Sequence, residues 1–151
     1  MLTPPSSDKI IASGGVLLAD GDDYVPNWPL ACGWSLRSWV EENRETVVRF
    51  IRAWSASCDW LLKPENKAET IDILMRQQGL TQERAEHAYV RVVPKGCINP
   101  DAIRQNMELR IELGLYPPPH HSAEQFYDTS YWCEATGLTA PAAGGKPKNA
   151  A

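Results

Sequence analysis

The chain has 151 residues, which is enough for one domain with its own core. Its residues are 43% hydrophobic and 23% charged, a composition typical of a globular protein and not of a disordered one. The formal net charge of -4 argues against nucleic acid or an anionic membrane as the main partner, because phosphate binding requires clustered Lys and Arg.

The N-terminal residues "MLTPPSSDK" do not have the pattern of a secretory signal, since a basic region followed by an apolar one is missing. No apolar run approaches the roughly 20 residues that span a bilayer. We therefore expect no transmembrane segment, and a cytoplasmic location if the chain is complete as given.

In chain order, residues 6–15 predict a short helix that begins at a serine cap and ends at a glycine pair. Residues 16–20, "VLLAD", predict a buried strand. A proline-containing loop over 20–29 and a second strand over 30–37 follow, and residues 38–42 predict a helical turn.

The loop begins with "DGDD", which resembles the start of a calcium-binding loop. The EF-hand pattern requires Gly at the sixth position and Glu at the twelfth, but counting from Asp20 these positions hold Val25 and Ala31. We interpret the segment as a solvated turn, and we expect no metal and no cofactor.

The strongest element is the helix predicted over residues 43–63. Asn43 is a suitable N-cap, and Pro64 ends the helix. Apolar residues recur at steps of three and four, which predicts one core-facing stripe; its members are Val47, Ile51, Trp54, Cys58 and Leu61.

Four further helices are predicted over residues 66–79, 81–93, 99–114 and 122–136. The tail over 138–151 is low in complexity, and we expect it to be disordered.

Six tryptophans are many for this length, and five of them fall between Trp28 and Trp60. Aromatic side chains at Trp28, Trp34 and Trp39 could form the wall of a small-ligand pocket, or they could pack between layers of a larger protein. Trp54 is most simply a core residue.

The four cysteines show no CxxC spacing, which argues against a zinc or thioredoxin-type site. Buried free thiols are the favoured interpretation, with one disulfide as the alternative. The adjacent histidines, His120 and His121, are poorly placed for chelation, and no hydrolase, phosphate-loop or metalloprotease motif occurs. We therefore expect no enzymatic activity.

Two short strands ahead of five helices do not form a stable sheet alone. The first predicted strand is apolar throughout, which is typical of a strand covered on both faces of a larger sheet. The sequence thus predicts part of a larger α/β protein, mostly helical with two or three short strands.

Several segments together resemble one family. The chain is similar, over residues 1 to about 137, to the C-terminal half of a type 2 periplasmic substrate-binding protein of an ABC importer. The relevant group binds nitrate, sulfonates, taurine or the thiamine pyrimidine precursor. The segments that carry the resemblance are "LTPPSSDK", "VLLADGDDYVPNWP", "ENRETVVRFIRAWSASCDWLLKPENKAETIDILM", "GLTQERAEHAYV" and "AEQFYDTSYWCEATG".

The resemblance implies a two-lobed α/β fold that closes on a small polar or anionic solute like a clamshell, and an ABC permease as partner. It places the chain in the periplasm, or anchored on the outer side of the membrane. A helix beginning at the cleft would direct free N–H groups toward the ligand. The ligand-binding candidates that follow from it are Thr3, Pro4, Ser6, Ser7, Trp28 and Trp34.

Members of the family carry an export signal and a first lobe ahead of the matching half, and this sequence contains neither. The cysteine-rich run of the fungal pyrimidine-synthesising relatives is missing too, so their single-turnover chemistry is not implied. The alternative hypothesis is a stand-alone helical interaction module that has lost solute binding and associates with a partner or with itself.

Overall fold

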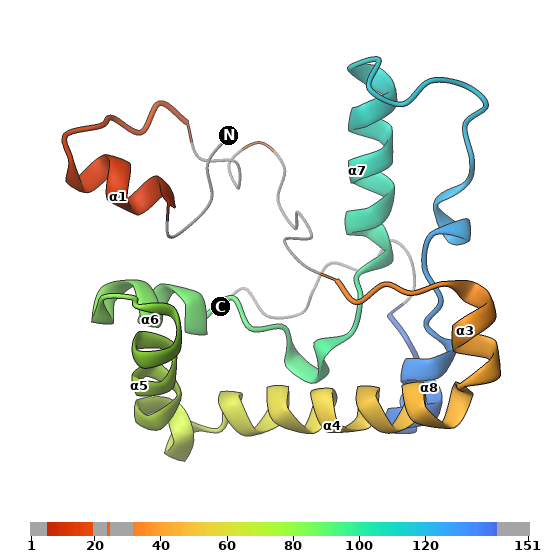
Figure 1. Ribbon diagram of the computed structural model, residues 1–151, viewed down its shortest axis with the longest axis horizontal. Coiled ribbons are helices and arrows are strands. Elements are labelled where there is room, and N and C mark those ends of the chain that lie inside the picture. The colour runs from red at the N-terminus through yellow and green to blue at the C-terminus, as the bar shows by residue number, and fades with distance from the viewer. Residues whose placement is uncertain (1–5, 20–23, 25–31, 142–151) are drawn as a thin grey trace.

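The computed structural model describes residues 6–19, 24 and 32–141, and the helices in this part of the chain dominate its fold (Figure 1). The α-helices are α1 (Ser6–Ala12), α3 (Arg37–Glu42), α4 (Arg44–Leu62), α5 (Lys67–Gln78), α6 (Gln82–Tyr89), α7 (Pro100–Glu112) and α8 (Ser130–Thr136). Single 3₁₀ turns occur at η1 (Pro64–Asn66), η2 (Pro94–Gly96) and η3 (Ala123–Gln125).

The long helix α4 forms the base of the arrangement in Figure 1. Helix α5 follows the C-terminal end of α4 and packs against α6, whereas α8 packs against the N-terminal half of α4. The η2 turn packs against α4 between these two places, at Trp54, Cys58 and Asp59. Helix α7 packs against η3, whereas α1 has no extensive packing partner among the described helices. The fold is thus a set of local helix contacts joined through α4.

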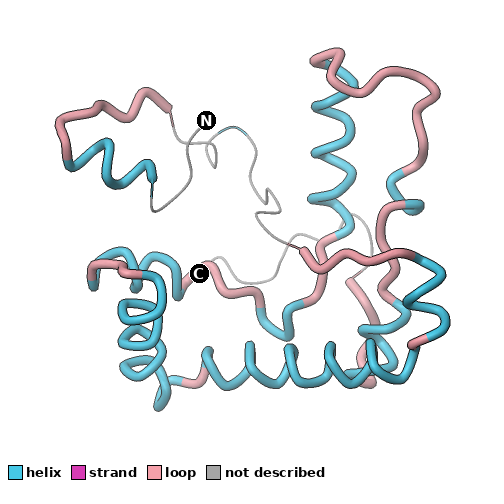
Figure 2. Tube along the Cα trace, in the orientation of Figure 1, coloured by secondary structure: helices cyan, strands magenta, loops and turns pink. Residues whose placement is uncertain are grey.

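Both predicted strands are wrong where the structure describes them. Residues 16–19 and 32–36 have no regular secondary structure, and Figure 2 shows no strand along the described part of the trace. A strand needs a neighbour for its backbone hydrogen bonds, and neither segment has one here. Arg37, predicted to end the second strand, is instead the first residue of α3.

The predicted helices over residues 6–15, 43–63, 66–79 and 99–114 are confirmed with small shifts of their ends. The helix predicted over 81–93 is shorter, because α6 ends at Tyr89.

The helix ends show why these boundaries could be predicted. Gly79 ends α5 with φ 66°, a left-handed conformation that glycine adopts without steric cost. Asn99 caps α7 by accepting a hydrogen bond of 3.0 Å from the backbone N–H of Asp101. Asn43, by contrast, does not cap α4 with its side chain but donates its amide to the carbonyl of Trp39 in α3.

The single helix predicted over residues 122–136 is wrong, because η3 and α8 are separate. The side chain of Asp128 accepts a 2.8 Å hydrogen bond from the backbone N–H of Ser130, which starts α8 afresh.

The core lies where α4 meets α8. Val48, Tyr131 and Ala135 form its buried cluster, and Ile51 packs against it. The predicted core stripe of α4 is confirmed in part: Cys58 is buried, and Val47 and Ile51 pack against the cluster. It is wrong for Trp54, which is 54% exposed, and it misses the buried Val48 and Ser55.

The η2 turn ties α4 to α8. The Lys95 ammonium pairs with Asp59 on α4, and the Lys95 carbonyl accepts a 3.0 Å hydrogen bond from the indole N–H of Trp132 on α8. At the next residue, Gly96, a Cβ would overlap the indole nitrogen of Trp54. Only glycine fits between this turn and α4, which explains the close approach.

Large apolar side chains are exposed along the described part of the chain, among them Leu18 at 94%, Trp34 at 89% and Phe50 at 66%. The described part of the fold thus leaves a substantial apolar area open to solvent.

Candidate interaction surface

The ligand contacts predicted from the sequence are not gathered into one site by the described residues. Three of them lie outside these residues: Thr3, Pro4 and Trp28. Ser6 and Ser7 form the first turn of α1, which has only seven residues. Trp34 is 89% exposed in an irregular segment, so it forms no pocket wall in the chain as it stands.

The acidic loop that begins at Asp20 also lies outside the described residues. Within the described part of the chain, no three His, Cys, Asp or Glu side chains come together as metal ligands would.

One side of α4 forms a surface with no charge. At 3.6 residues per turn, the positions within about 60° of Phe50 around the helix axis carry only apolar or small polar side chains. We call this side the uncharged stripe; its members are Thr46, Val47, Phe50, Ala53, Trp54, Ser57 and Leu61.

The uncharged stripe is open to solvent at its large residues. Phe50 is 66% exposed and Trp54 is 54% exposed, although Trp54 was expected in the core. Ala53 and Ser57, between and beside them, are exposed as well. Exposed aromatic residues on a surface depleted in charge are typical of the centre of a protein–protein interface.

The charged residues of α4 lie off this stripe, and several of them hold the other side of the helix in place. Arg44 donates a 2.9 Å hydrogen bond from Nε to Glu134 on α8, and Arg52 donates one of 3.2 Å to the carbonyl of Ala135. The hydrogen bond to Glu134 raises the pKa of Arg44 above its usual value, against a smaller opposing effect of burial. These contacts of α4 are thus directed toward α8, whereas Phe50, Ala53 and Ser57 of the uncharged stripe are exposed and Val47, at its edge, packs against the core cluster.

The cysteines are free thiols, as favoured from the sequence, but they are not uniformly buried. Cys58 is buried, Cys97 and Cys133 are half-buried, and Cys32 is exposed. Burial, with a smaller effect of Cys133, raises the pKa of Cys97 to about 11. This thiol is therefore protonated at neutral pH, a state that suits apolar packing better than nucleophilic attack.

Comparison with family models, with curated proteins and with solved structures finds no match for this chain. None of the described helices is both long enough and apolar enough to cross a membrane.

Sequence reasoning missed the uncharged stripe as a surface, although the signal was present. Charged residues occur on α4 at Arg49, Arg52 and Asp59 but on no position within the stripe. The periodicity of apolar residues predicts that a helix face packs against another element, but it does not tell whether that element belongs to the same chain.

Proposed function

We propose that the chain is the C-terminal, mostly helical part of a solute-binding protein of an ABC importer. In this proposal the uncharged stripe of α4 packs against a first lobe. The exposed stripe is the observation that carries the proposal, since Phe50, Ala53 and Ser57 are exposed on a helix whose opposite side is packed. The sequence segments that resemble the family include this helix.

The proposal also accounts for the segment that follows α1. Val16, Leu17 and Leu18 are 80%, 60% and 94% exposed, an unfavourable arrangement for three consecutive apolar residues. Added to the sheet of a larger α/β protein, they would form the buried strand that their composition predicts. The two-lobed α/β fold therefore stays part of the proposal.

The function would be transport without catalysis. A small polar or anionic solute, such as nitrate, taurine, another sulfonate or a thiamine pyrimidine precursor, would bind between the lobes and shift them toward the closed state. The closed protein would then deliver the solute to an ABC permease outside the cytoplasm. Ser6, Ser7 and Trp34 are the proposed ligand contacts within the described residues.

The second candidate is a stand-alone helical interaction module, and the same stripe favours it. A charge-free stripe with exposed Phe and Trp side chains also fits a groove on another protein or on a second copy of the chain. The two candidates differ in whether a solute stabilises the protein.

A ligand screen tests the first candidate against the second. The chain, joined to any first lobe that the genomic sequence upstream of Met1 encodes, is heated with nitrate, taurine, an alkanesulfonate and a thiamine pyrimidine precursor. A solute present at 100 times its Kd stabilises the folded state by about 2.7 kcal/mol, which raises the melting temperature measurably. No shift with any solute, together with no upstream lobe, contradicts the transport function.

A further inference from the structure

A cavity of about 530 Å³ lies beside α7, between this helix and the segment that follows it. This volume lies within the range of about 300–1,000 Å³ that is common for small-molecule sites. In Figure 1, α7 is well separated from α1, so the cavity is a different place from the proposed solute contacts Ser6 and Ser7. It is also separate from the uncharged stripe of α4, because none of the lining residues belongs to that helix.

The lining of the cavity is set by how α7 ends. The carbonyl of Arg110 accepts hydrogen bonds from the backbone N–H groups of Leu115 (2.8 Å) and Tyr116 (3.1 Å). Gly114, with φ 68°, allows the chain to reverse at this point. The reversal carries Tyr116 back over the face of α7.

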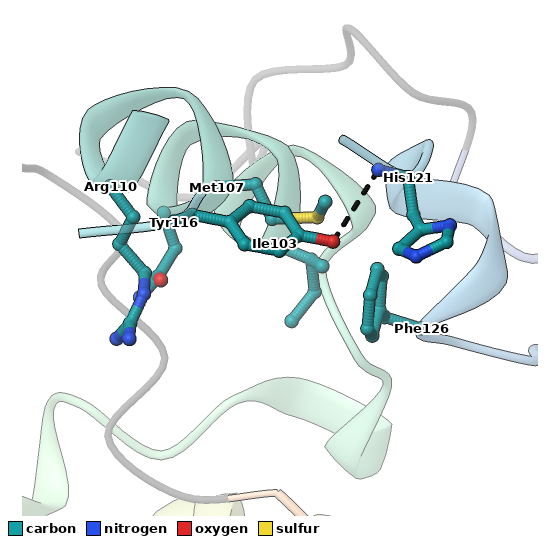
Figure 3. A pocket seen from close by; sticks show the side chains of 7 residues that line it. Ile103, Met107, Arg110, Tyr116, His121 and Phe126 are labelled. Atoms are coloured by element: carbon teal, nitrogen blue, oxygen red, sulfur yellow. Dashed lines mark hydrogen bonds between the residues drawn. The ribbon is translucent and has the colours of Figure 1, made fainter. Parts of the chain in front are cut away.

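The far side of the cavity comes from the segment before α8. The backbone N–H of His121 donates a 3.4 Å hydrogen bond to the Tyr116 hydroxyl. The rings of His121 and Phe126 meet edge to face, with 6.4 Å between their centres. Figure 3 shows Arg110 at one end of the cavity, His121 and Phe126 at the other, and Tyr116 between them.

The chemistry of these walls is amphipathic. Ile103 and Met107 supply an aliphatic and thioether floor, which together with the rings of Tyr116 and Phe126 suits a flat aromatic group. The guanidinium of Arg110 is exposed, and it forms no ion pair with another described residue. Arginine binds a carboxylate or sulfonate through paired hydrogen bonds.

We propose that this cavity binds a small aromatic acid. Its ring lies between Met107, Tyr116 and Phe126, and its single anionic group is bound by Arg110. The proposal is independent of the function proposed above, because it involves neither the α4 stripe nor the solute contacts near α1.

The test uses 2-naphthoate as the probe and the methionine methyl groups as reporters. The chain has three methionines: Met107 lines the cavity, and Met75 lies on α5 and serves as an internal reference. With ¹³C-methyl-methionine protein, titration is expected to shift the Met107 resonance in NMR spectra and to leave the Met75 resonance in place. Met107→Leu identifies the resonance.

Two comparisons establish the role of the anion. Arg110→Gln is expected to weaken naphthoate binding about tenfold, through loss of a charge-assisted hydrogen bond. Arg76→Gln, which removes an exposed cation of α5, serves as the matched control and leaves the affinity unchanged. The neutral analogue 2-naphthamide is expected to bind as weakly to the unaltered chain as naphthoate binds to Arg110→Gln.

Three results would each overturn the proposal. They are equal movement of the Met75 and Met107 resonances, equal affinity for naphthamide and naphthoate, and unchanged affinity in Arg110→Gln.

Discussion

The two sides of α4 have similar apolar content but opposite surroundings. On one side, Val48 and Cys58 are 4% and 5% exposed and lie against α8 and the η2 turn. On the other side, Phe50 is 66% exposed, and Ala53 and Ser57 are exposed as well. The difference teaches that one apolar side of α4 is used within the described residues, whereas the other is exposed and is the side for which we propose a partner layer.

The largest expected effect comes from removing the anchor of the packed side. Trp132 is 8% exposed, and its indole N–H is bonded to the Lys95 carbonyl, so Trp132→Ala should lower the free energy of unfolding by about 3–5 kcal/mol. Urea unfolding followed by circular dichroism measures the loss.

Trp34→Ala is the matched control, because Trp34 is 89% exposed. Its free energy of unfolding should change by less than about 0.5 kcal/mol. Similar losses in the two variants would show that the contact between α4 and α8 is not the core.

The second-largest expected effect is that of Gly96→Ala, which tests how closely the η2 turn approaches α4. Gly96→Ala adds a Cβ that would overlap Trp54 and lie 3.1 Å from the Cys58 sulfur, at a residue with φ 60°. We expect a loss of about 1–3 kcal/mol from overpacking, in addition to about 1–2 kcal/mol from the left-handed backbone. Thermal unfolding under matched conditions measures the sum.

Gly114→Ala isolates the backbone effect, because Gly114 has φ 68° but no atom within 4 Å of an added Cβ. Its destabilisation should be the smaller of the two. If the two alanine variants unfold at the same temperature, the η2 turn does not press on Trp54.

A smaller effect concerns the start of α8, which supports the packed side of α4. Burial raises the pKa of Asp128, but hydrogen bonds from Ser130, aided by Arg37 and Arg44, outweigh it, and the pKa lies below its usual value. Asp128→Ala should cost about 1 kcal/mol at neutral pH, the usual net contribution of one lost hydrogen bond, here the one from the Ser130 N–H.

The sign of the pH dependence follows from the lowered pKa. Asp128 stabilises the fold fully above the unfolded-state pKa of about 3.9, and this contribution is lost as the pH falls through the lower folded-state pKa. The difference in stability between the chain and Asp128→Ala should thus shrink from pH 6 toward pH 2 in urea titrations. A difference that stays constant over this range would refute the assignment.

The sequence predicted most helices well because their ends depend on local chemistry. Pro64, Gly79 and Asn99 act within one turn of the chain, and each lies at or next to the predicted boundary. The strands predicted over 16–20 and 30–37 could not be predicted reliably from local pattern, because a strand forms only when a neighbouring strand pairs with it. The single helix over 122–136 was wrong because the side chain of Asp128 competes for the backbone.

The candidate surface was only half predictable. The apolar period of α4 was visible in the sequence, but which residues face inward depended on where α8 and η2 lie. These segments follow α4 by more than 30 residues, as the Lys95–Asp59 and Arg44–Glu134 contacts show. The cavity beside α7 likewise forms only because residues 116–126 fold back against this helix, and no periodic pattern in the sequence predicts that contact.

The most direct test of the central claim, that the uncharged stripe is an interface, is sedimentation velocity of the 151-residue chain. If the stripe is an interface, as proposed, the chain should self-associate through Phe50 and Ala53 and sediment above its monomer mass of 16.8 kDa. Phe50→Lys combined with Ala53→Lys should restore the monomer, and Ala68→Lys on α5, an equally exposed alanine, should not. An unaltered chain that sediments as a monomer, indistinguishable from the double variant, would contradict the account.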